Sequence, residues 1–402
     1  MKQTSQFEKE ALWRHHDSEW RDPAQVAVQW AGAADIDPSL IKPEIKGSWW
    51  QTLSDCQATI FVTREYEHLA MAMTVHDDRP LISFLPMPHP SGLAVDRQRK
   101  IVFLASTRNP NQIYDLAPVA TLMETNGVKK RNLEHRPLVP QRSRFFPGSL
   151  YIHDLALIND ELYANAVGQN AVVKLSEGGG FRRAWWPRCV ESSAGPIFDR
   201  NLIQLNSIAA GADLASSFFS ASAAKISRHR PGQPNFAVDG RGVVFSGKTR
   251  EAIAHGLTRP HSARLWKGKL WIDNSGYGEV GRIEDGKFET VTKLPGWTRG
   301  LCFKNGIAFV GTSRIIPRFR QYAPGLDVDK SVCGIHAVDI RSGRVRGSIT
   351  WPLGNQIFAV EWMPKRVTTG FPFLFGKQHS PRREKLLFYA YQNRSIRGAR
   401  NV

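Results

Sequence analysis

The stretch His261-Ser262-Ala263-Arg264-Leu265-Trp266 decides the fold, because the chain repeats its pattern. A polar or small residue comes first, a small residue follows, and an apolar run completes the segment. Four further segments follow this pattern, and they begin at Ser91, His153, Asn206 and Arg299. We call the first residue of each segment its lead residue. The spacing between successive lead residues is uneven, which is typical of propeller blades joined by loops of unequal length.

A turn and a second apolar strand follow most of these segments. After His261 the second strand is Lys269-Leu270-Trp271-Ile272, and a third run, Gly278-Glu279-Val280-Gly281-Arg282-Ile283, comes next. Gly and Asn mark the turns between the runs, as in consecutive hairpins. The repeated unit therefore predicts a four-stranded blade with its first strand innermost.

A sixth inner strand is predicted at Gln356-Ile357-Phe358-Ala359-Val360-Glu361-Trp362, with Phe358 as its lead residue. Little strand-like sequence follows it. Three apolar runs near the start of the chain have no blade of their own, and they are Ala58 to Val62, His68 to Ala72 and Leu81 to Phe84. Pairing these runs with the last inner strand would remove the open edge of the ring. We therefore predict an all-β fold, a six-bladed β-propeller closed by N-terminal strands, with N- and C-terminal extensions.

The composition agrees with this prediction and divides the chain into three parts. The 402 residues include 33 Gly and 24 Pro, which suits many short strands joined by turns. We assign residues 1–50 to an N-terminal extension, 51–364 to the propeller and 365–402 to a C-terminal tail. No run of residues is long and apolar enough to span a membrane, and the first ten residues lack the apolar core of a signal peptide. We therefore expect a cytoplasmic protein.

The net charge of +18 is concentrated partly in the C-terminal tail. Residues 365–402 contain nine Lys or Arg and a single acid, Glu384, with aromatic residues between them. Such a tail is suited to an acidic protein partner, or it packs across the propeller as a strap with solvated charges. The chain has no recognised nucleic-acid motif, so we do not expect nucleic acid as a partner.

Three motifs resemble an uncharacterised bacterial family. They are Thr258-Arg259-Pro260-His261-Ser262-Ala263, Asn274-Ser275-Gly276-Tyr277-Gly278 and Leu294-Pro295-Gly296-Trp297-Thr298-Arg299-Gly300. That family has a conserved domain of unknown function, is sometimes joined to tetratricopeptide repeats, and is expected to be a propeller. The resemblance implies the fold but no reaction. Relatives tend to carry Glu-Leu-Tyr-Asp-Val where this chain has Gln356-Ile357-Phe358-Ala359-Val360, so two acids and a phenol are absent here.

The repeat also resembles, more distantly, the six-bladed lactonase and strictosidine-synthase-like propellers. In those proteins the lead residues surround a central channel and bind a metal. The resemblance implies that His153, Asn206, His261 and Arg299 face one channel, with Ser91 and Phe358 completing the ring.

These residue types suggest chemistry for that channel. Two imidazoles and an amide, from His153, Asn206 and His261, are expected to hold a divalent metal such as zinc, manganese or calcium. Substrate would be bound by Ser91, Arg264 and Arg299, of which the two arginines suit a carboxylate or phosphate. Asp154 and Glu361 are candidates for a general base, and Arg299 belongs with them in the catalytic set. The predicted activity is a metal-assisted lyase or hydrolase reaction on a small anionic or peptide-like substrate.

A second interpretation remains open. Propeller channels usually hold water and need polar residues, so the lead residues would then serve only the structure. In this case the protein is a non-catalytic binding module for a protein, peptide or glycan. The two interpretations differ in what they predict: substitutions in the channel would be nearly silent in the second, whereas deletion of the basic tail would abolish partner capture.

Overall fold

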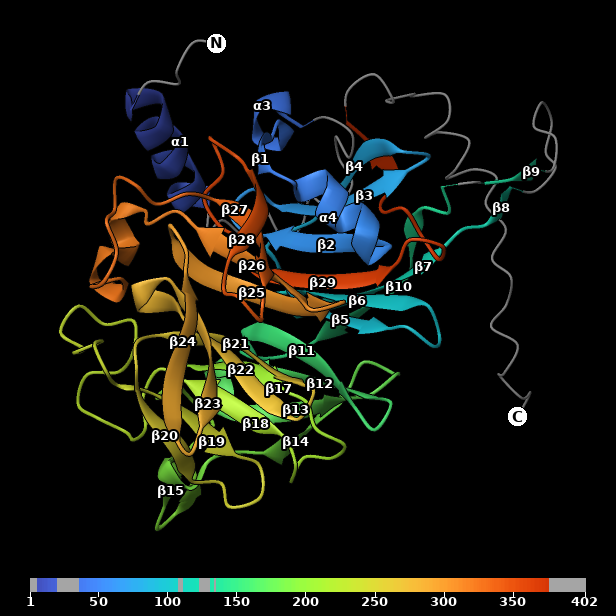
Figure 1. Cartoon of the computed structure of the whole chain (residues 1–402). Coiled ribbons are helices and arrows are strands. Elements are labelled where there is room, and N and C mark those ends of the chain that lie inside the picture. Colours follow the sequence, from blue (N-terminus) through green and yellow to red (C-terminus); the bar gives the residue numbers. More distant parts are fainter. Residues whose placement is uncertain (1–5, 20–35, 108–110, 123–130, 134, 376–402) are drawn as a thin grey trace, which may run out of the picture.

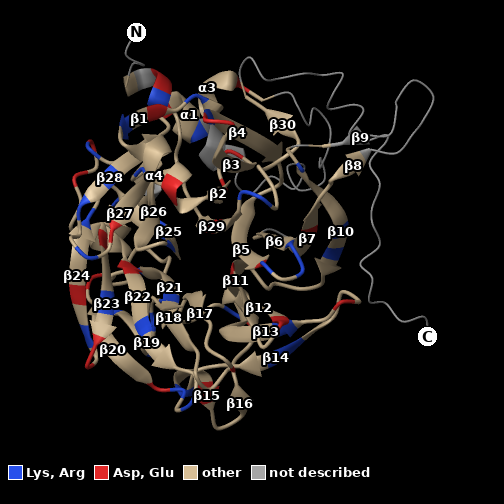
Figure 2. Cartoon of the chain, turned by 45° about the vertical axis from the view of Figure 1, so that its right-hand side comes forward, with Lys and Arg blue, Asp and Glu red and all other residues tan. Residues whose placement is uncertain are grey.

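Six antiparallel sheets surround a central axis (Figure 2). The structure is a computed structural model that describes residues 6–19, 36–107, 111–122, 131–133 and 135–375. The inner strands contact one another in a closed circle, in the order β5, β11, β17, β21, β25, β29 and again β5. The predicted six-bladed β-propeller is thus confirmed, and Figure 1 shows its blades in the order of the chain.

The first four blades follow one another along the sequence, each with its first strand innermost. Blade one contains β5 (Pro90–Asp96), β6 (Ile101–Ser106), β7 (Asn111–Pro118) and β10 (Leu138–Phe146), and blade two contains β11 (Ile152–Ile158), β12 (Glu161–Ala166), β13 (Ala171–Leu175) and β14 (Phe181–Trp185). Blade three contains β17 (Leu205–Ala209), β18 (Phe218–Ala221), β19 (Gly242–Ser246) and β20 (Ala252–Leu257), and blade four contains β21 (Pro260–Trp266), β22 (Lys269–Asn274), β23 (Glu279–Glu284) and β24 (Lys287–Lys293).

Short turns with left-handed backbone join the first two strands of several blades. Asn159 and Asp160 have φ of 50° and 59° between β11 and β12, and Asn305-Gly306 has φ of 50° and 79° between β25 and β26. Positive φ at both central residues is the geometry of the tight hairpin turns that match the twist of the strands. Asn, Asp and Gly adopt it most readily, which explains the turn residues of the repeat.

Blade six closes the ring with strands from both ends of the chain. Its inner strand β29 (Ala359–Pro364) pairs with β2 (Ala58–Arg64), which continues to β3 (Leu69–His76) and β4 (Arg79–Pro86). The predicted N-terminal closure is therefore confirmed. A short strand from the C-terminal tail, β30 (Phe373–Leu374), adds to the outer edge of β4.

The N-terminal extension is tied to the ring. Blade five contains β25 (Trp297–Lys304), β26 (Ile307–Ser313), β27 (Gly334–Asp339) and β28 (Val345–Thr350), and β1 (Glu44–Gly47) pairs with β28 as a fifth strand that the sequence pattern did not predict. Buried Arg64 donates from Nη1 to the main-chain oxygen of Leu40 at 2.5 Å, and Trp351 donates from Nε1 to that of Ile41 at 3.1 Å. These bonds fix α3 (Pro38–Ile41) against blades five and six.

The other elements are short or peripheral. The other described α-helices are α1 (Gln6–Glu19) and α4 (Trp49–Cys56), and the short 3₁₀ helices are η1 (Val167–Gln169), η2 (Arg188–Val190), η3 (Ser275–Tyr277) and η4 (Pro317–Tyr322). Two small ribbons are formed by β8 (Thr121–Leu122) with β9 (Arg131–Asn132) and by β15 (Glu191–Ser192) with β16 (Gly195–Pro196). Among the described helices, none has the length and apolar character needed to cross a membrane.

Hydrogen bonds from side chains join each blade to the next. Within the described residues, six such bonds reach a main-chain oxygen at the start of the neighbouring inner strand, over 2.6 to 3.1 Å. The donor and acceptor pairs are Ser91 with Ile152, Asn165 with Leu205, Asn206 with Pro260, Ser275 with Thr298, Ser313 with Ile357, and Thr63 with Ser91. We call them the inter-blade bonds, and together they complete the circle.

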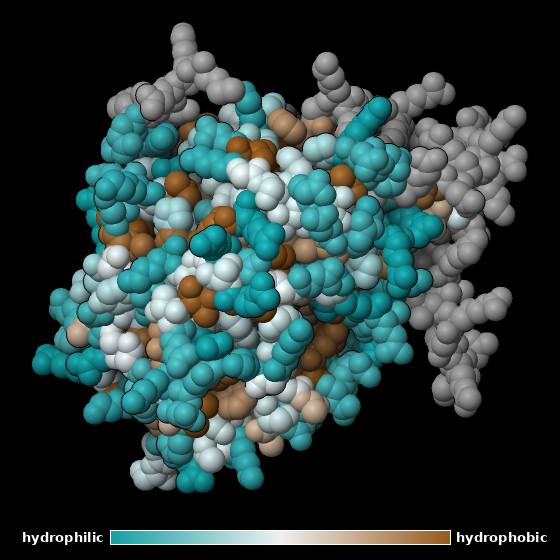
Figure 3. Space-filling view, in the orientation of Figure 1, coloured by the Kyte–Doolittle hydropathy of each residue, from teal (hydrophilic) through white to brown (hydrophobic). Residues whose placement is uncertain are grey.

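The sides of the blades pack against each other through apolar cores, whereas the outside is mostly polar. All residues of β2 are buried, because this strand is covered on both faces. Figure 3 shows a largely hydrophilic surface with scattered apolar residues, and Figure 2 shows basic residues distributed over several blades. Large buried polar residues near the axis are therefore the exception that points to function.

Candidate functional site

Polar and aromatic residues converge where the inner strands begin. Two residues before each lead residue, the chain carries a second set of side chains that includes His89, Tyr151, Gln204 and Arg259. These four residues have φ between 41° and 54°, a left-handed backbone that large side chains seldom adopt. Four equivalent positions share this costly conformation, which indicates that the fold imposes it. We call these residues, with Trp297 and Gln356 at the same position, the collar.

Among the lead residues, His261 has the contacts that say most about the chemistry of the site. Its Nδ1 lies 2.8 Å from the main-chain oxygen of Arg259 and 3.1 Å from Oγ of Ser275. A carbonyl oxygen only accepts hydrogen bonds, so Nδ1 carries the proton and Nε2 carries a lone pair. Within the described residues, Nε2 is buried and has no hydrogen-bond partner. The ring also packs edge-on against Trp297, with centroids 5.2 Å apart.

The imidazole of His261 is held in its neutral form. Burial lowers its pKa well below the usual value, and the positive charges of Arg299 and Arg259 lower it further. The hydrogen bond to Arg259 opposes this effect only in part. His261 thus presents an uncharged nitrogen with a lone pair beside two guanidinium groups.

Arg259 is a buried cation whose hydrogen-bonding capacity is mostly unused. It is 6% exposed, and its guanidinium lies over the ring of Tyr322, 4.5 Å from the centroid. Within the described part of the chain, its Nε and Nη1 atoms have no hydrogen-bond partner. Burial lowers its pKa, which reflects the cost of holding this charge away from water.

Arg299 lies in the same cluster and is partly anchored. Its guanidinium is 3.2 Å from the ring centroid of Phe358. When the Gln356 amide is oriented to satisfy both neighbours, its oxygen accepts from Nη1 of Arg299 at 2.8 Å and its nitrogen donates to Oε2 of Glu65 at 3.0 Å. Nη2 of Arg299 has no partner among the described residues. Burial lowers the pKa of Arg299 to about 10, although Glu65 opposes this shift.

His153 completes the group that we call the axial cluster: His153, Arg259, His261 and Arg299. The His153 ring packs against Tyr151 at 4.8 Å and edge-on against Phe358 at 5.3 Å between centroids. Because Phe358 also contacts Arg299, blades two, five and six meet at this phenyl ring. The structure therefore brings together four of the predicted residues, His153, His261, Arg299 and Phe358.

Ser91 and Asn206 lie at the predicted level but are engaged with the backbone. Ser91 Oγ lies 3.2 Å from the main-chain oxygen of Ala105 and also forms an inter-blade bond. Asn206 donates from Nδ2 to Pro260 at 2.9 Å and to Ser222 Oγ at 3.0 Å. Its Oδ1, in contrast, has no partner within the described residues. Asn206 therefore keeps one free acceptor next to the strand that carries His261.

Asp154 and Arg264 form an ion pair and do not join the axial cluster. Both oxygens of Asp154 accept from the guanidinium of Arg264, at 2.8 and 3.2 Å, and the carboxylate also accepts from the main-chain N–H groups of Leu155 and Ile208. These contacts occupy the carboxylate fully. The predicted roles of the two residues in base catalysis and substrate binding stay predictions, and their contacts here are structural.

Glu361 also lies apart from the axial cluster. It pairs with Arg97 at 3.0 Å, at the end of β5. Next to it, Trp362 lies between Arg97 and Lys304, whose charged groups are 4.2 and 4.3 Å from its ring centroid. Blades five, six and one are thus joined at the closing blade. A catalytic role for Glu361 remains a prediction, and nothing described here links it to His261.

Aromatic side chains cover the axial cluster. Tyr66, Trp297, Phe319 and Tyr322 form one buried apolar group with Ile315 and Ile316. Trp297 contacts both His261 and Phe319, with centroids 5.2 and 5.1 Å apart. The loop that contains η4 therefore lies over the start of the inner strands and shields the arginines from water.

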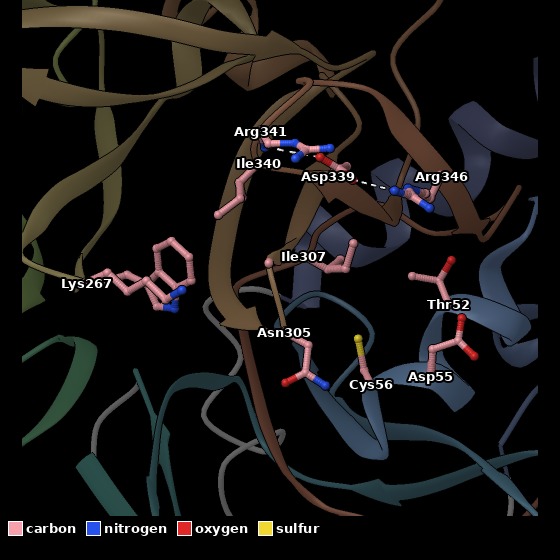
Figure 4. A pocket seen from close by; sticks show the side chains of 12 residues that line it. Thr52, Asp55, Cys56, Lys267, Asn305, Ile307, Asp339, Ile340, Arg341 and Arg346 are labelled. Carbon is pink, nitrogen blue, oxygen red and sulfur yellow. Dashed lines mark hydrogen bonds and ion pairs between the residues drawn. The ribbon is translucent and has the colours of Figure 1, made fainter.

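A separate cavity of about 440 Å³ lies between blade five, α4 and the turn after β21 (Figure 4). Its lining residues include Asp55, Cys56, Lys267 and Asn305, and Arg346 on its wall pairs with Asp339. Burial raises the pKa of Cys56 to about 11, so its thiol is protonated. None of the lead residues lines this cavity.

The donor set of the axial cluster fits an anion better than a metal ion. Within the described residues, no group of three or more His, Cys, Asp or Glu side chains is arranged to hold a metal. The predicted ligands His153, Asn206 and His261 contain no carboxylate, and the charges of Arg259 and Arg299 act on His261. Two guanidinium groups would repel a divalent cation. The predicted metal site stays a prediction.

Sequence reasoning missed Arg259, Tyr151, Gln356 and Glu65. The first three belong to the collar, two residues before a lead residue, so the same repeat would have revealed them. Glu65 follows β2 of the closing blade and lies outside every repeat. No sequence signal pointed to it, because the contact that brings it to Arg299 passes through Gln356.

Several solved structures are similar to this chain at low sequence identity. One, from the nidogen/laminin complex, has a TM-score of 0.48 and 9% identity, and the match covers 78% of this chain and 99% of that one. A protein of unknown function from Bacteroides caccae has a TM-score of 0.47 and 8% identity, with coverage of 76% and 98%. A gluconolactonase from Xanthomonas campestris has a TM-score of 0.42 and 13% identity, and the match covers 80% of this chain and 88% of that one. These similarities carry no argument about activity.

At the level of families, a model described as "Domain of unknown function (DUF4915)" matches residues 47–370. This range begins at the end of β1 and runs past β29, so it contains all six blades. No curated protein matches the chain.

Proposed function

Since the chain belongs to the DUF4915 family of domains of unknown function, and this membership carries no reaction, we propose its function from the site itself. In this proposal the axial cluster binds a small organic anion. Arg259 and Arg299 bind the anionic group, and His153, His261 and the surrounding aromatic side chains enclose the rest of the molecule.

One observation carries the proposal. Arg259 and Arg299 are 6% and 5% exposed, and three of their N–H groups have no hydrogen-bond partner within the described residues. A buried cation without partners costs several kcal/mol, and natural proteins avoid this cost unless a counterion or function compensates for it. A carboxylate or phosphate bound between the two guanidinium groups would supply the missing acceptors.

The charge balance points in the same direction. The axial cluster contains two guanidinium groups, and Glu65 is the carboxylate whose charge raises the pKa of Arg299. Glu65 accepts from the amide of Gln356, which in turn accepts from Arg299, and Glu65 also accepts from Thr107 at 2.8 Å. Two guanidinium groups beside this one carboxylate leave an excess of positive charge in the axial cluster. An anionic ligand would neutralise this excess.

The lyase or hydrolase activity predicted from the sequence remains part of this proposal. Elimination and hydrolysis both need a base close to the bound anion. The unprotonated and unpartnered Nε2 of His261 is the candidate for that base, because an anion bound to Arg259 and Arg299 would offset the charges that lower its pKa. Asp154 is less suited, because Arg264 and two main-chain N–H groups already bind its oxygens.

The alternative of a binding module that uses its basic tail is not favoured by any contact of the tail residues that the structure describes, 365–375. Residues 365–375 of the tail pack on blade six, where Phe373 pairs with Phe84. Residues 376–402, which carry most of the basic charge of the tail, lie outside the described residues.

Calorimetric titration of the purified protein with phosphate, sulfate and small carboxylates tests the proposal. Replacing Arg259 by Met removes the charge and keeps most of the volume, so affinity should fall by at least about tenfold, as expected for a charged hydrogen bond. Arg200→Met is the matched control, because the Arg200 side chain is 67% exposed. If none of the anions binds, or if both variants bind as the parent does, the proposal is wrong.

A further inference from the structure

The axial cluster offers hydrogen-bond acceptors as well as donors. Nε2 of His261 carries a lone pair, because Nδ1 donates to the main-chain oxygen of Arg259. Oδ1 of Asn206 is likewise an acceptor, since its Nδ2 donates to Pro260 and to Ser222. Both acceptor atoms are buried and have no partner among the described residues.

The residues that carry these two acceptors lie on neighbouring inner strands. Asn206 binds the main-chain oxygen of Pro260, the residue directly before His261. Both side chains come from lead positions of neighbouring blades, on β17 and β21. An anionic group would satisfy the arginines but neither acceptor, because a deprotonated carboxylate or phosphate has no proton to donate. The two unpartnered acceptors therefore require a hydrogen-bond donor from a different part of the ligand.

We infer that the ligand is a hydroxylated anion, with a carboxylate or phosphate on Arg259 and Arg299 and a hydroxyl group that donates to His261 Nε2 or Asn206 Oδ1. This inference rests on the proposed function and adds a hydroxyl requirement to it. Hydroxy acids and sugar phosphates share this chemistry. A hydroxyl on His261 would also be in contact with the unprotonated nitrogen that a proton-transfer reaction would use.

The physical reason for selectivity is the cost of leaving buried acceptors unpaired. An analogue that lacks the hydroxyl displaces water from the site but returns no donor, so His261 and Asn206 stay unsatisfied. Sites built to bind a hydroxyl reject the analogue without it far more strongly than an apolar pocket rejects a change of one methylene. The preference should therefore be measurable even for a small ligand.

The test compares ligands that differ by hydroxyl groups. Lactate is matched with propionate, and glycerol 3-phosphate with n-propyl phosphate, which separates the carboxylate source from the phosphate source. Affinities are measured by calorimetry at millimolar ligand concentrations. In the parent protein we expect the hydroxylated member of at least one pair to bind about tenfold more tightly, as expected for one well-formed buried hydrogen bond.

Two variants of His261 locate the effect. The amide nitrogen of Asn takes the place of Nδ1, so His261→Asn keeps the bond to Arg259 and removes the Nε2 acceptor. The longer Gln side chain places an amide oxygen near the position of Nε2. We expect His261→Asn to lose most of the preference for the hydroxyl and His261→Gln to keep part of it. Thermal unfolding of both variants shows whether each one folds, and at least one folded variant suffices for the comparison.

The outcomes separate this inference from the proposed function. If both members of each pair bind the parent equally well, the anion site stands and the hydroxyl requirement is wrong. If the preference exists but persists unchanged in folded His261→Asn and Asn206→Leu variants, each of which lacks one of the two acceptors, these acceptors do not cause it, and the inference is overturned. If no ligand binds at all, the proposed function and the inference both fail.

Discussion

Asp154 and Arg264 are 110 residues apart in the sequence, and they form a two-pronged ion pair with N to O distances of 2.8 and 3.2 Å. Asp154 belongs to blade two and Arg264 to blade four, so the pair spans the blade between them. Arg264 also donates to the main-chain oxygen of Ile208 in that blade. Three of the six blades are thus linked by a single ion pair.

Breaking this pair should destabilise the propeller. Asp154→Asn keeps the shape of the side chain but leaves the half-buried Arg264 charge without its counterion, which costs up to about 3 to 5 kcal/mol, the loss typical of a fully buried pair. The double variant Asp154→Asn/Arg264→Met should recover much of the loss, because no charge remains. Urea unfolding measures both, and Glu251→Gln, whose ion pair with Arg188 is exposed, should change little. An unchanged stability of Asp154→Asn would argue against a structural role and for the predicted catalytic one.

The inter-blade bonds should be most important at the closing blade. Thr63 Oγ1 donates to Ser91 at 2.6 Å and accepts from the N–H of Ala359 at 3.0 Å, and it is fully buried. Thr63→Val keeps the volume and leaves two buried main-chain groups unsatisfied, so we expect a loss of about 1 to 3 kcal/mol. Thr290→Val, on the exposed part of β24, is the matched control. Equal stabilities of the two variants in denaturant would show that the ring closes without this bond.

Stability should fall in mild acid, partly through His336. Its nitrogens contact Thr312 Oγ1 at 2.9 Å and Ser348 Oγ at 2.8 Å in blade five. Burial, with a smaller contribution from Lys46, lowers its pKa to about 4. Because the unfolded chain binds this proton near pH 6.5, stability is lost as the pH falls from about 6.5 to 4, by about 3 kcal/mol.

The variant His336→Gln should lack this part of the pH dependence. Unfolding free energies of the parent and the variant, measured at several pH values between about 6.5 and 4, give the contribution of His336 directly. His255 is exposed, so His255→Gln should follow the parent. A variant and parent with parallel pH profiles would exclude His336 as a source of acid sensitivity.

The fold could be predicted from the sequence to a large extent, since each blade repeats a local pattern. Lead residues such as His153 and His261 mark the inner strands. The apolar runs from Ala58 onward belong to no repeat, so the incomplete sixth blade was the position that could take them, and β2 does pair with β29. The pairing of β1 with β28 was not predictable, because a four-residue polar strand carries no pattern. Its position depends on contacts that Arg64 and Trp351 make with the extension.

The site was predictable only in part. The repeat placed His153, His261 and Arg299 together, because equivalent positions of a closed ring converge on its axis. It could not show that Arg264 binds the carboxylate of Asp154, since the two residues belong to blades that are not neighbours. Nor could it show which nitrogen of His261 is protonated, because this depends on the position of the Arg259 main-chain oxygen. Contacts that depend on how distant blades pack against each other cannot be predicted from a repeated sequence pattern.

Elemental analysis decides between an anion and a metal at the axis. The excess of positive charge from Arg259 and Arg299 predicts no stoichiometric zinc, manganese or calcium in the purified protein, even after exposure to these ions. The comparison variant is His153→Ala/His261→Ala. Near-stoichiometric metal in the parent that is absent from the folded double variant would support the predicted metal site and contradict the charge argument.

The most direct measurement is a crystal structure of the protein soaked with selenate, a tetrahedral dianion whose selenium is located by anomalous scattering. The proposal predicts a selenate whose oxygens lie about 2.7 to 3.2 Å from Nη1 of Arg259 and Nη2 of Arg299. The same soak of Arg259→Met crystals should show no anion there. Selenate bound at surface arginines alone, with no anion at Arg259 and Arg299, would contradict the claim that this propeller binds an anion on its axis.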